Sequence, residues 1–380
     1  MPPGDPNFPS DLSIKPSTRQ VLRLDAGADG DEHEAAQDVQ RFGIAGRTWE
    51  AAYFLRLYLT PPRPASPSDP PPRVFDPPCP LFPPSSLQTA PVPTPPTLEH
   101  QRQRMILEIG AGTGYLSLSL APHLSRARDR IVATDLPSVC PLLEENLAAA
   151  QERWRASSST NGTPAAPGDG PASVLVRPLP WGDACALADL QAEGLSPDLI
   201  LASDLVYFEF LYGPLLRTLL GLTEPRGEEG ESAVVLFSYK VRSLTKEQPF
   251  WEAFGRWFAF DAVHISPPAR PDPPASAHPP TSSEHAHLQM PTTTPPPPLA
   301  WTRFGAGIPS SSSSSPASSE TDELYLFVCR RHPKTYGASV RLSEEQTSDD
   351  ELLQGRKAGK GVEAGAGRFE EIILAGLEWD

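Results

Sequence analysis

The amino-acid sequence predicts one α/β domain in three layers (αβα), with helices on both faces of a seven-stranded, mostly parallel sheet. Two observations carry this prediction. Short apolar runs with β-branched residues alternate with longer amphipathic runs between residues 105 and 258, which is the pattern of repeated βαβ units. Two later apolar runs are separated mainly by a segment rich in proline and serine, so they can form an antiparallel last pair.

The first half of the domain begins with MILEIG, a short apolar run that is typical of a buried strand. A helical run, the strand IVATD and the long run PLLEENLAAAQERW follow. In that long run, helical spacing places Leu142, Leu143, Leu147 and Trp154 on one face. The predicted elements of this half are strands at 105–110 and 131–135 and helices at 115–124 and 141–154.

The second half continues the alternation. SVLVRP, DLILASD and AVVLFSY are short apolar runs, whereas GPLLRTLLGL and the aromatic QPFWEAFGRWF have helical spacing. FDAVHI and ELYLFVC supply the last two strands. The predicted elements are strands at 173–178, 198–204, 233–239, 260–265 and 323–329 and helices at 213–222 and 248–258.

Proline marks the parts of the chain that lie outside this core. The sequence holds 48 prolines, of which 16 fall in residues 61–103 and 14 in residues 266–320. Proline lacks an N–H and fixes φ, and such segments bury too little apolar surface to offset their ordering entropy. We therefore expect a partly disordered N-terminal segment (1–39), a single domain (40–332) with disordered insertions (61–103, 157–172 and 266–320), and an acidic, largely disordered tail (333–380).

Charge and cysteine usage restrict the class of partner and the compartment. A formal net charge of −15 disfavours nucleic-acid and acidic-membrane binding, and it fits either a basic partner or simple solubility. The four cysteines form no C-x-x-C pair, and the chain opens with no secretory signal pattern and holds no transmembrane run. We expect a cytoplasmic protein, with the nucleus as the alternative, and no metal site, since His285 and His287 form only a weak pattern.

A glycine-rich loop, LEIGAGTGYLS, joins the first strand to the first helix. Its glycines are Gly110, Gly112 and Gly114, and they allow a sharp turn and a close approach of the backbone to a ligand. Tyr115 stands where a dinucleotide fingerprint would have its third glycine, so the pattern is E-x-G-x-G-x-G. Asp135 ends the second strand, where a carboxylate can accept both hydroxyls of a ribose. Together these features indicate a nucleoside-binding site.

Three further segments carry a more specific resemblance. They are GRTWEAAYFLRLYL (46–59), PLPWGD (178–183) and PDLILASDLVYFEFLYGPLLRTL (197–219). With the glycine loop they resemble methyltransferase family 16, a group of seven-β-strand protein-lysine methyltransferases that act on non-histone proteins. The resemblance implies a Rossmann-like class I methyltransferase fold, S-adenosylmethionine as cofactor, and a protein substrate such as translation elongation factor 1A. It also implies a monomer.

The resemblance also assigns roles to residues of this chain. Trp49 should lie against the cofactor, its helix covering the methionine end, and Trp181 should lie on the adenine side, where an indole stacks on a purine. The implied cofactor-binding set is Trp49, Glu108, Gly110, Ala111, Gly112, Gly114, Asp135, Trp181 and Ser203. The implied catalytic residues belong to a D/E-x-x-Y/F motif and are Asp204 and Tyr207.

The chemistry of methyl transfer sets what these residues must do. A lysine ammonium has no lone pair, and its ordinary pKa is about 10.4, so the site must favour the neutral amine. We expect Asp204 to orient the amine and Tyr207 with Phe208 to wall the lysine channel. Lys240 and Arg242 follow the fifth strand at the same edge of the sheet, and we interpret them as solvated charges rather than as substrate contacts.

Three other functions remain open at this point. A methyltransferase for a small amine or metabolite would have the same cofactor site, although no ordered cover for a small acceptor is evident. A non-catalytic scaffold would use the proline-rich segments to bind other domains. A nicotinamide-dependent oxidoreductase is disfavoured by Tyr115 and by the lack of a hydride-site motif.

Overall fold

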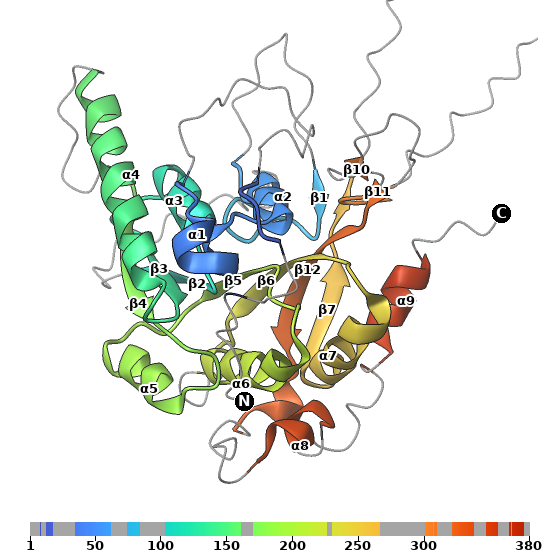
Figure 1. Ribbon diagram of the computed structural model, residues 1–380. Coiled ribbons are helices and arrows are strands. Elements are labelled where there is room, and N and C mark those ends of the chain that lie inside the picture. The colour runs from blue at the N-terminus through green and yellow to red at the C-terminus, as the bar shows by residue number, and fades with distance from the viewer. Residues whose placement is uncertain are drawn as a thin grey trace, which may run out of the picture.

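The computed structural model describes residues 8, 13–17, 35–61, 74–83, 103–160, 170–225, 230–266, 301–306, 308–309, 321–337, 347–355, 365 and 367–375. These residues form one α/β domain with a sheet between two layers of helices (Figure 1). Within these ranges no helix has both the length and the apolar character that a membrane span needs.

The central sheet has seven strands in the order β4-β3-β2-β5-β6-β12-β7. Their bounds are β2 Arg104–Ile109, β3 Asp129–Asp135, β4 Ser173–Pro178, β5 Leu199–Ser203, β6 Val234–Lys240, β7 Phe258–Ala262 and β12 Leu324–Arg331. The first five strands of that order pair in parallel, and β12 pairs antiparallel with both β6 and β7. The predicted seven-stranded, mostly parallel sheet with its antiparallel strand is therefore confirmed.

Helices cover the sheet on both faces, as Figure 1 shows. One face carries α2 (Glu50–Tyr58), α3 (Tyr115–Leu120) with the short η4 (Ala121–His123), and α4 (Cys140–Thr160). The other carries α5 (Ala184–Ala192), α6 (Tyr212–Leu222) and α7 (Leu244–Trp257). Alternation along β6 explains why both faces need cover, because Phe237 is buried in one apolar core and Leu236 in the other. The helix α5 was not predicted, and Asp183 begins it by accepting from the amides of Cys185 and Ala186.

A second, small sheet changes the predicted boundaries of two insertions. It consists of β1 (Phe75–Asp76), β8 (His264–Ile265) and β9 (Thr302–Arg303), all antiparallel. The predicted strand 260–265 is thus divided between β7 and β8. Phe304, which follows β9, is buried and stacks on Phe54 with ring centroids 4.2 Å apart. Residues 74–83 and 301–306 therefore pack into the domain, although they were expected to be disordered.

The same correction applies at other boundaries. The helix α4 continues to Thr160, past the expected start of an insertion at 157. A short hairpin, β10 (Ile308–Pro309) with β11 (Thr321–Asp322), lies at the end of the third expected insertion. Apart from residues 61, 103, 170–172 and 266, the remainder of the three expected insertions lies outside the described residues, as do His285 and His287.

The expected disordered tail contributes two helices to the core. After η6 (Pro333–Thr335), α8 (Asp349–Leu353) packs on α6 and α7, and α9 (Arg368–Ala375) packs on α7 and β7. Leu352 and Phe369 are buried, and Phe369 stacks on Trp251 with ring centroids 5.0 Å apart. Isolated apolar residues in an acidic stretch supply this contact, which is why the sequence pattern alone indicated a tail.

Candidate active site

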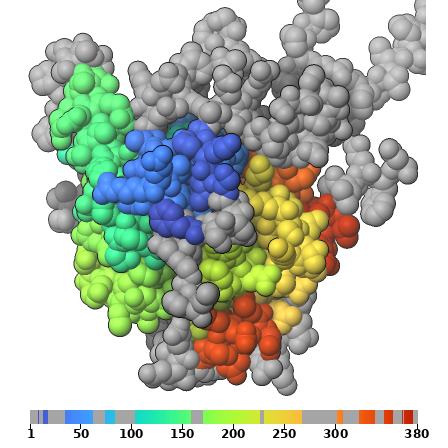
Figure 2. All heavy atoms as spheres, in the orientation of Figure 1, coloured from blue at the N-terminus to red at the C-terminus, as the bar shows by residue number. Residues whose placement is uncertain are grey.

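A pocket of about 180 Å³ lies at the carboxyl ends of β2, β3 and β5. We call residues 35–61 the cap segment, which includes α1 (Val39–Phe42), η2 (Gly43–Gly46) and α2, and several of its residues line the pocket. In Figure 2 the cap segment (blue) is at the surface between α4 (green) and α7 (yellow). Every residue predicted for the site lines this pocket, with the exceptions of Gly114 and Phe208: they are Trp49, Glu108, Gly110, Ala111, Gly112, Asp135, Trp181, Ser203, Asp204 and Tyr207.

The glycine loop needs glycine for conformation as well as for space. Gly110, Gly112 and Gly114 have φ of 58°, 54° and 76°, a region that favours residues without a Cβ. A Cβ on Gly112 would lie 2.8 Å from the carbonyl oxygen of Ala45 in the cap segment. Gly114 instead faces Leu143 of α4, and its role is to let α3 begin beside that helix.

Asp135 connects the second strand to the glycine loop. Its Oδ2 accepts from the amide of Gly112 at 2.8 Å, and its Oδ1 accepts from the amide of Leu136 at 2.7 Å. Burial raises the pKa of this carboxyl to about 6, against the opposing effect of the two amides. Each carboxylate oxygen has a second acceptor position, so the group can still bind a pair of ribose hydroxyls.

Glu108 holds the loop in place from below. Its Oε2 accepts from the amide of Ser117 at 3.0 Å and from the Ser117 hydroxyl at 2.5 Å, which attaches β2 to the first turn of α3. Burial raises the pKa of Glu108 to about 7. The hydroxyl of Thr134 donates to the Glu108 carbonyl, so the two strands below the pocket are also linked there.

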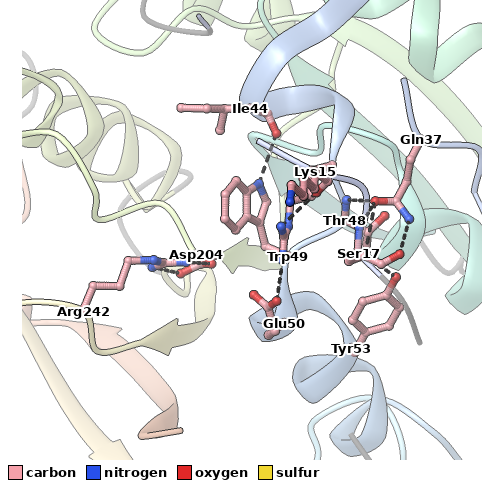
Figure 3. Close-up of polar contacts among 11 residues, drawn as sticks. Lys15, Ser17, Gln37, Ile44, Thr48, Trp49, Glu50, Tyr53, Asp204 and Arg242 are labelled. Atoms are coloured by element: carbon pink, nitrogen blue, oxygen red, sulfur yellow. Dashed lines mark hydrogen bonds and ion pairs between the residues drawn. The ribbon is translucent and has the colours of Figure 1, made fainter. Parts of the chain in front are cut away.

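The cap segment is fixed to this floor by polar contacts that sequence reasoning missed. The hydroxyls of Thr48 and Thr113 lie 2.8 Å apart in a buried contact. The indole of Trp49 donates to the carbonyl of Ile44 at 3.1 Å, and Trp49 is the residue before α2 rather than part of that helix. Figure 3 shows Ser17 beside Tyr53 on the outer side of the cap segment, with hydroxyls 3.0 Å apart. The signal for these contacts was weak, because single threonines and serines occur in every loop.

Aromatic side chains form the opposite wall. Trp181 and Tyr207 meet edge to face at 6.4 Å between ring centroids, and Tyr207 meets Phe208 at 4.9 Å. Phe208 then stacks on Phe210, which is 64% exposed. Burial holds the pKa of Tyr207 well above its usual range, so its hydroxyl stays protonated at neutral pH. The wall therefore runs from the pocket to the molecular surface.

Asp204 and Arg242 form an ion pair at the same edge, which corrects the interpretation of Arg242 as a solvated charge. The Arg242 Nη1 donates to Oδ1 of Asp204 at 2.7 Å, and its Nη2 donates to Oδ2. Asp204 has φ of 61°, and its amide donates to the carbonyl of Ser238 on β6 at 2.9 Å. This left-handed residue, of a type that tolerates the conformation, directly follows β5 and lines the pocket.

The pocket fits the expected cofactor in two respects. The buried hydroxyl of Ser203 has no hydrogen-bond partner among the described residues, although it lines the pocket. A buried hydroxyl normally has a partner, and a bound ligand would supply one. The glycine loop, Asp135 and Trp181 also provide a close backbone approach, a diol acceptor and a flat apolar wall. No group of His, Cys, Asp and Glu side chains within the described ranges could hold a metal ion.

Comparison with known proteins gives three kinds of match. A family model described as lysine methyltransferase matches residues 28–256. The protein-lysine N-methyltransferase EFM6 of Saccharomyces cerevisiae is 28% identical over 170 residues, which are 43% of this chain and 59% of the yeast protein. The chain thus spans less than two thirds of the length of that relative.

Among solved structures, the rRNA methyltransferase aviRa of Streptomyces viridochromogenes matches with a TM-score of 0.27 and 22% identity, over 37% of this chain and 68% of that one. A precorrin-6y C5,15-methyltransferase of Geobacter metallireducens matches with a TM-score of 0.27 and 14% identity, over 43% and 69%.

Proposed function

Because the chain belongs to the lysine methyltransferase family, we propose that it transfers a methyl group to the lysine side chain of a non-histone protein. Translation elongation factor 1A is the first candidate substrate. The methyl donor is S-adenosylmethionine, the cofactor that this family implies. One observation carries the proposal: the nucleoside features of the glycine loop and Asp135 lie in the same pocket as Asp204 and Tyr207.

The proposed chemistry needs little from the protein beyond binding and orientation. When bound, the cofactor would supply a methyl group on a sulfonium to the lone pair of the lysine nitrogen and would leave as a neutral thioether. Asp204 would orient the amine, and Tyr207 with Phe208 would keep water from it. Proximity and orientation then supply most of the rate, because no covalent nucleophile is required.

A protein acceptor is supported by the outer end of the aromatic wall. Phe210 is the most exposed of the large hydrophobic residues within the described ranges, and it stacks on Phe208 with ring centroids 5.3 Å apart. An exposed aromatic pair beside a catalytic pocket suits contact with an apolar side chain next to the target lysine. A small amine would have no use for this surface.

The first experiment measures cofactor binding. Wild-type protein is titrated with S-adenosylhomocysteine by calorimetry, beside Gly112→Arg and, as a matched control, Gly194→Arg. Gly194 also has positive φ, 74°, but an added Cβ there meets no atom within 4 Å. We expect micromolar binding by the wild type and the control, and none by Gly112→Arg. No binding by wild type at millimolar ligand would contradict a methyltransferase and favour a scaffold.

The second experiment identifies the acceptor. Wild-type protein and a cell extract are incubated with S-adenosylmethionine labelled in the methyl group, and the labelled protein is hydrolysed in acid. We expect the label in methyllysine. Label that is confined to small molecules would instead support a metabolite methyltransferase. A monomer and a cytoplasmic location complete the proposal; all four cysteines are free thiols, which agrees with a reducing compartment.

A further inference from the structure

The ion pair between Asp204 and Arg242 lies at the edge of the pocket, which Asp204 lines, and it is largely enclosed. The side chain of Asp204 is 1% exposed and that of Arg242 is 33% exposed. A two-pronged contact uses one acceptor position on each carboxylate oxygen and leaves another on each. Arg242 therefore leaves acceptor positions on the carboxylate for an N–H of an incoming amine, and the amine reaches them by displacing the side chains that enclose Asp204.

Several elements hold Arg242 in position. At the start of α7, Glu247 accepts from the amides of Arg242 and Ser243 at 3.2 and 3.1 Å, and it also accepts from the hydroxyl of Tyr239. The guanidinium lies 5.4 Å from the ring centroid of Trp49, on the cap segment. In Figure 3 the pair lies beside Trp49 and Glu50. Among the described residues, Arg242 is the only one that forms an ion pair with Asp204.

The charged and titratable groups around Asp204 and Arg242 determine the charge state of this ion pair. Arg47 and Glu50 form their own ion pair on the cap segment, with Nη2 and Oε1 2.5 Å apart. The other groups that face Asp204 and Arg242 are Glu247, Tyr207, Tyr239 and, across the pocket, Asp135. Burial lowers the pKa of Arg242, but the charges of Asp204, Glu50 and Glu247 outweigh it, so the pKa is raised and Arg242 is cationic at every working pH.

We infer that Arg242 is a positioning residue for the proposed methyl transfer: it cancels the charge of Asp204, so the target lysine meets a neutral pair instead of a free carboxylate. The inference rests on the proposed function. A free carboxylate in an enclosed pocket would hold lysine as the ammonium, which has no lone pair and cannot react. The paired carboxylate still accepts a hydrogen bond and orients the amine, but it no longer favours the protonated form.

The test measures kcat and KM against pH for wild type, Arg242→Gln, Asp204→Asn and the double variant. The substrate is the extract protein that wild type labels, purified and varied in concentration up to saturation. The midpoint of the kcat profile reports the lysine in the bound complex. In Arg242→Gln, the uncompensated carboxylate raises that midpoint by about one pH unit, which lowers kcat about tenfold below it. KM falls in the same variant, because the ammonium binds more tightly without reacting.

The other variants give opposite or cancelling results. Asp204→Asn keeps a residue that tolerates φ of 61° and leaves the cation uncompensated, so the midpoint moves down and KM rises. The double variant restores a neutral pair and the wild-type midpoint. Arg242→Lys keeps the cation and also keeps the wild-type midpoint, with a lower kcat from the lost two-pronged contact. Affinity for S-adenosylhomocysteine stays within about threefold of wild type throughout, a difference of under 1 kcal/mol.

A midpoint that does not move in either single variant, or a raised KM in Arg242→Gln, overturns the inference and leaves Arg242 as a support of the fold alone. If Arg242→Gln does not fold, since it buries an unpaired carboxylate, Asp204→Asn and the double variant decide the question by themselves. A wild-type enzyme that binds S-adenosylhomocysteine and forms no methyllysine overturns the proposed function, and the inference with it.

Discussion

If Asp135 accepts the ribose hydroxyls of the cofactor as proposed, cofactor affinity should depend on pH. The pKa of its carboxyl is about 6 because the group is buried. Only the ionised form can accept hydrogen bonds from two ribose hydroxyls, so protonation removes part of the site. About 90% of the group is ionised at pH 7 and about 10% at pH 5. Binding of S-adenosylhomocysteine should therefore weaken about tenfold between pH 7 and pH 5.

The contribution of these buried carboxyls to stability increases as the pH falls, whereas cofactor affinity decreases. Unfolding of the protein therefore cannot account for a loss of affinity at low pH. The folded-state pKa values of Asp135 and Glu108 are raised from 3.8 and 4.5 to about 6 and about 7. The folded protein binds more protons than the unfolded chain between those limits. The contribution of these two groups to the free energy of unfolding is consequently larger near pH 5 than near pH 7.

Calorimetric titrations between pH 5 and pH 8 on two variants separate the groups. Asp135→Asn cannot ionise, so its affinity is lower than that of wild type at pH 7 by about tenfold or more and shows no fall towards pH 5. Glu108→Gln keeps the acceptor for Ser117 and keeps the fall below pH 6. The reasoning is refuted if Asp135→Asn retains the pH dependence of wild type, or if Glu108→Gln abolishes it.

Three further predictions concern the surface, the loop and the C-terminal helices. Phe210→Ser should raise KM for the protein acceptor about tenfold without changing cofactor affinity. Leu374→Ser, at an exposed position of α9, should change neither quantity. Equal effects of the two substitutions on KM would argue against a docking role for Phe210. Gly112→Ala should lower the free energy of unfolding more than Gly194→Ala does, because the latter costs only the strain of positive φ, about 1 kcal/mol. Only Gly112→Ala should also weaken cofactor binding. Chemical denaturation measures the stability, and calorimetry measures the affinity. Phe369→Ala should lower the free energy of unfolding by about 3 kcal/mol, because a buried ring leaves a cavity, and a surface-like loss below 0.5 kcal/mol would contradict its place in the core.

The sheet and most of the pocket could be predicted because their signals are local. A buried strand, a glycine loop and a carboxylate at a strand end each occupy a few consecutive residues, so their chemistry is readable from the sequence. The predicted parallel strands with an antiparallel strand at the end followed from the same alternation, and the structure confirms them. Gly114 belongs to the motif for a different reason, since it makes room for Leu143 rather than for a ligand.

The features that could not be predicted depend on contacts between distant residues. Arg242 lies 38 positions from Asp204, and nothing near either residue indicates that they pair. The helices α8 and α9 bury few apolar residues each, so their periodicity is short and the acidic composition dominates. Phe304 follows a proline-rich stretch, and nothing in the local sequence indicates that it packs against Phe54.

The small sheet has a consequence for how much the chain can vary in length. Because β8 and β9 pair antiparallel, with Ile265 opposite Thr302, residues 266 and 301 lie near each other. The ends of the connecting stretch are therefore held together whatever its length, and doubling that length adds only about 0.6 kcal/mol of loop-closure free energy. Because the two short strands fix both ends of the connection, insertions and deletions between them can accumulate without disturbing the core or the pocket.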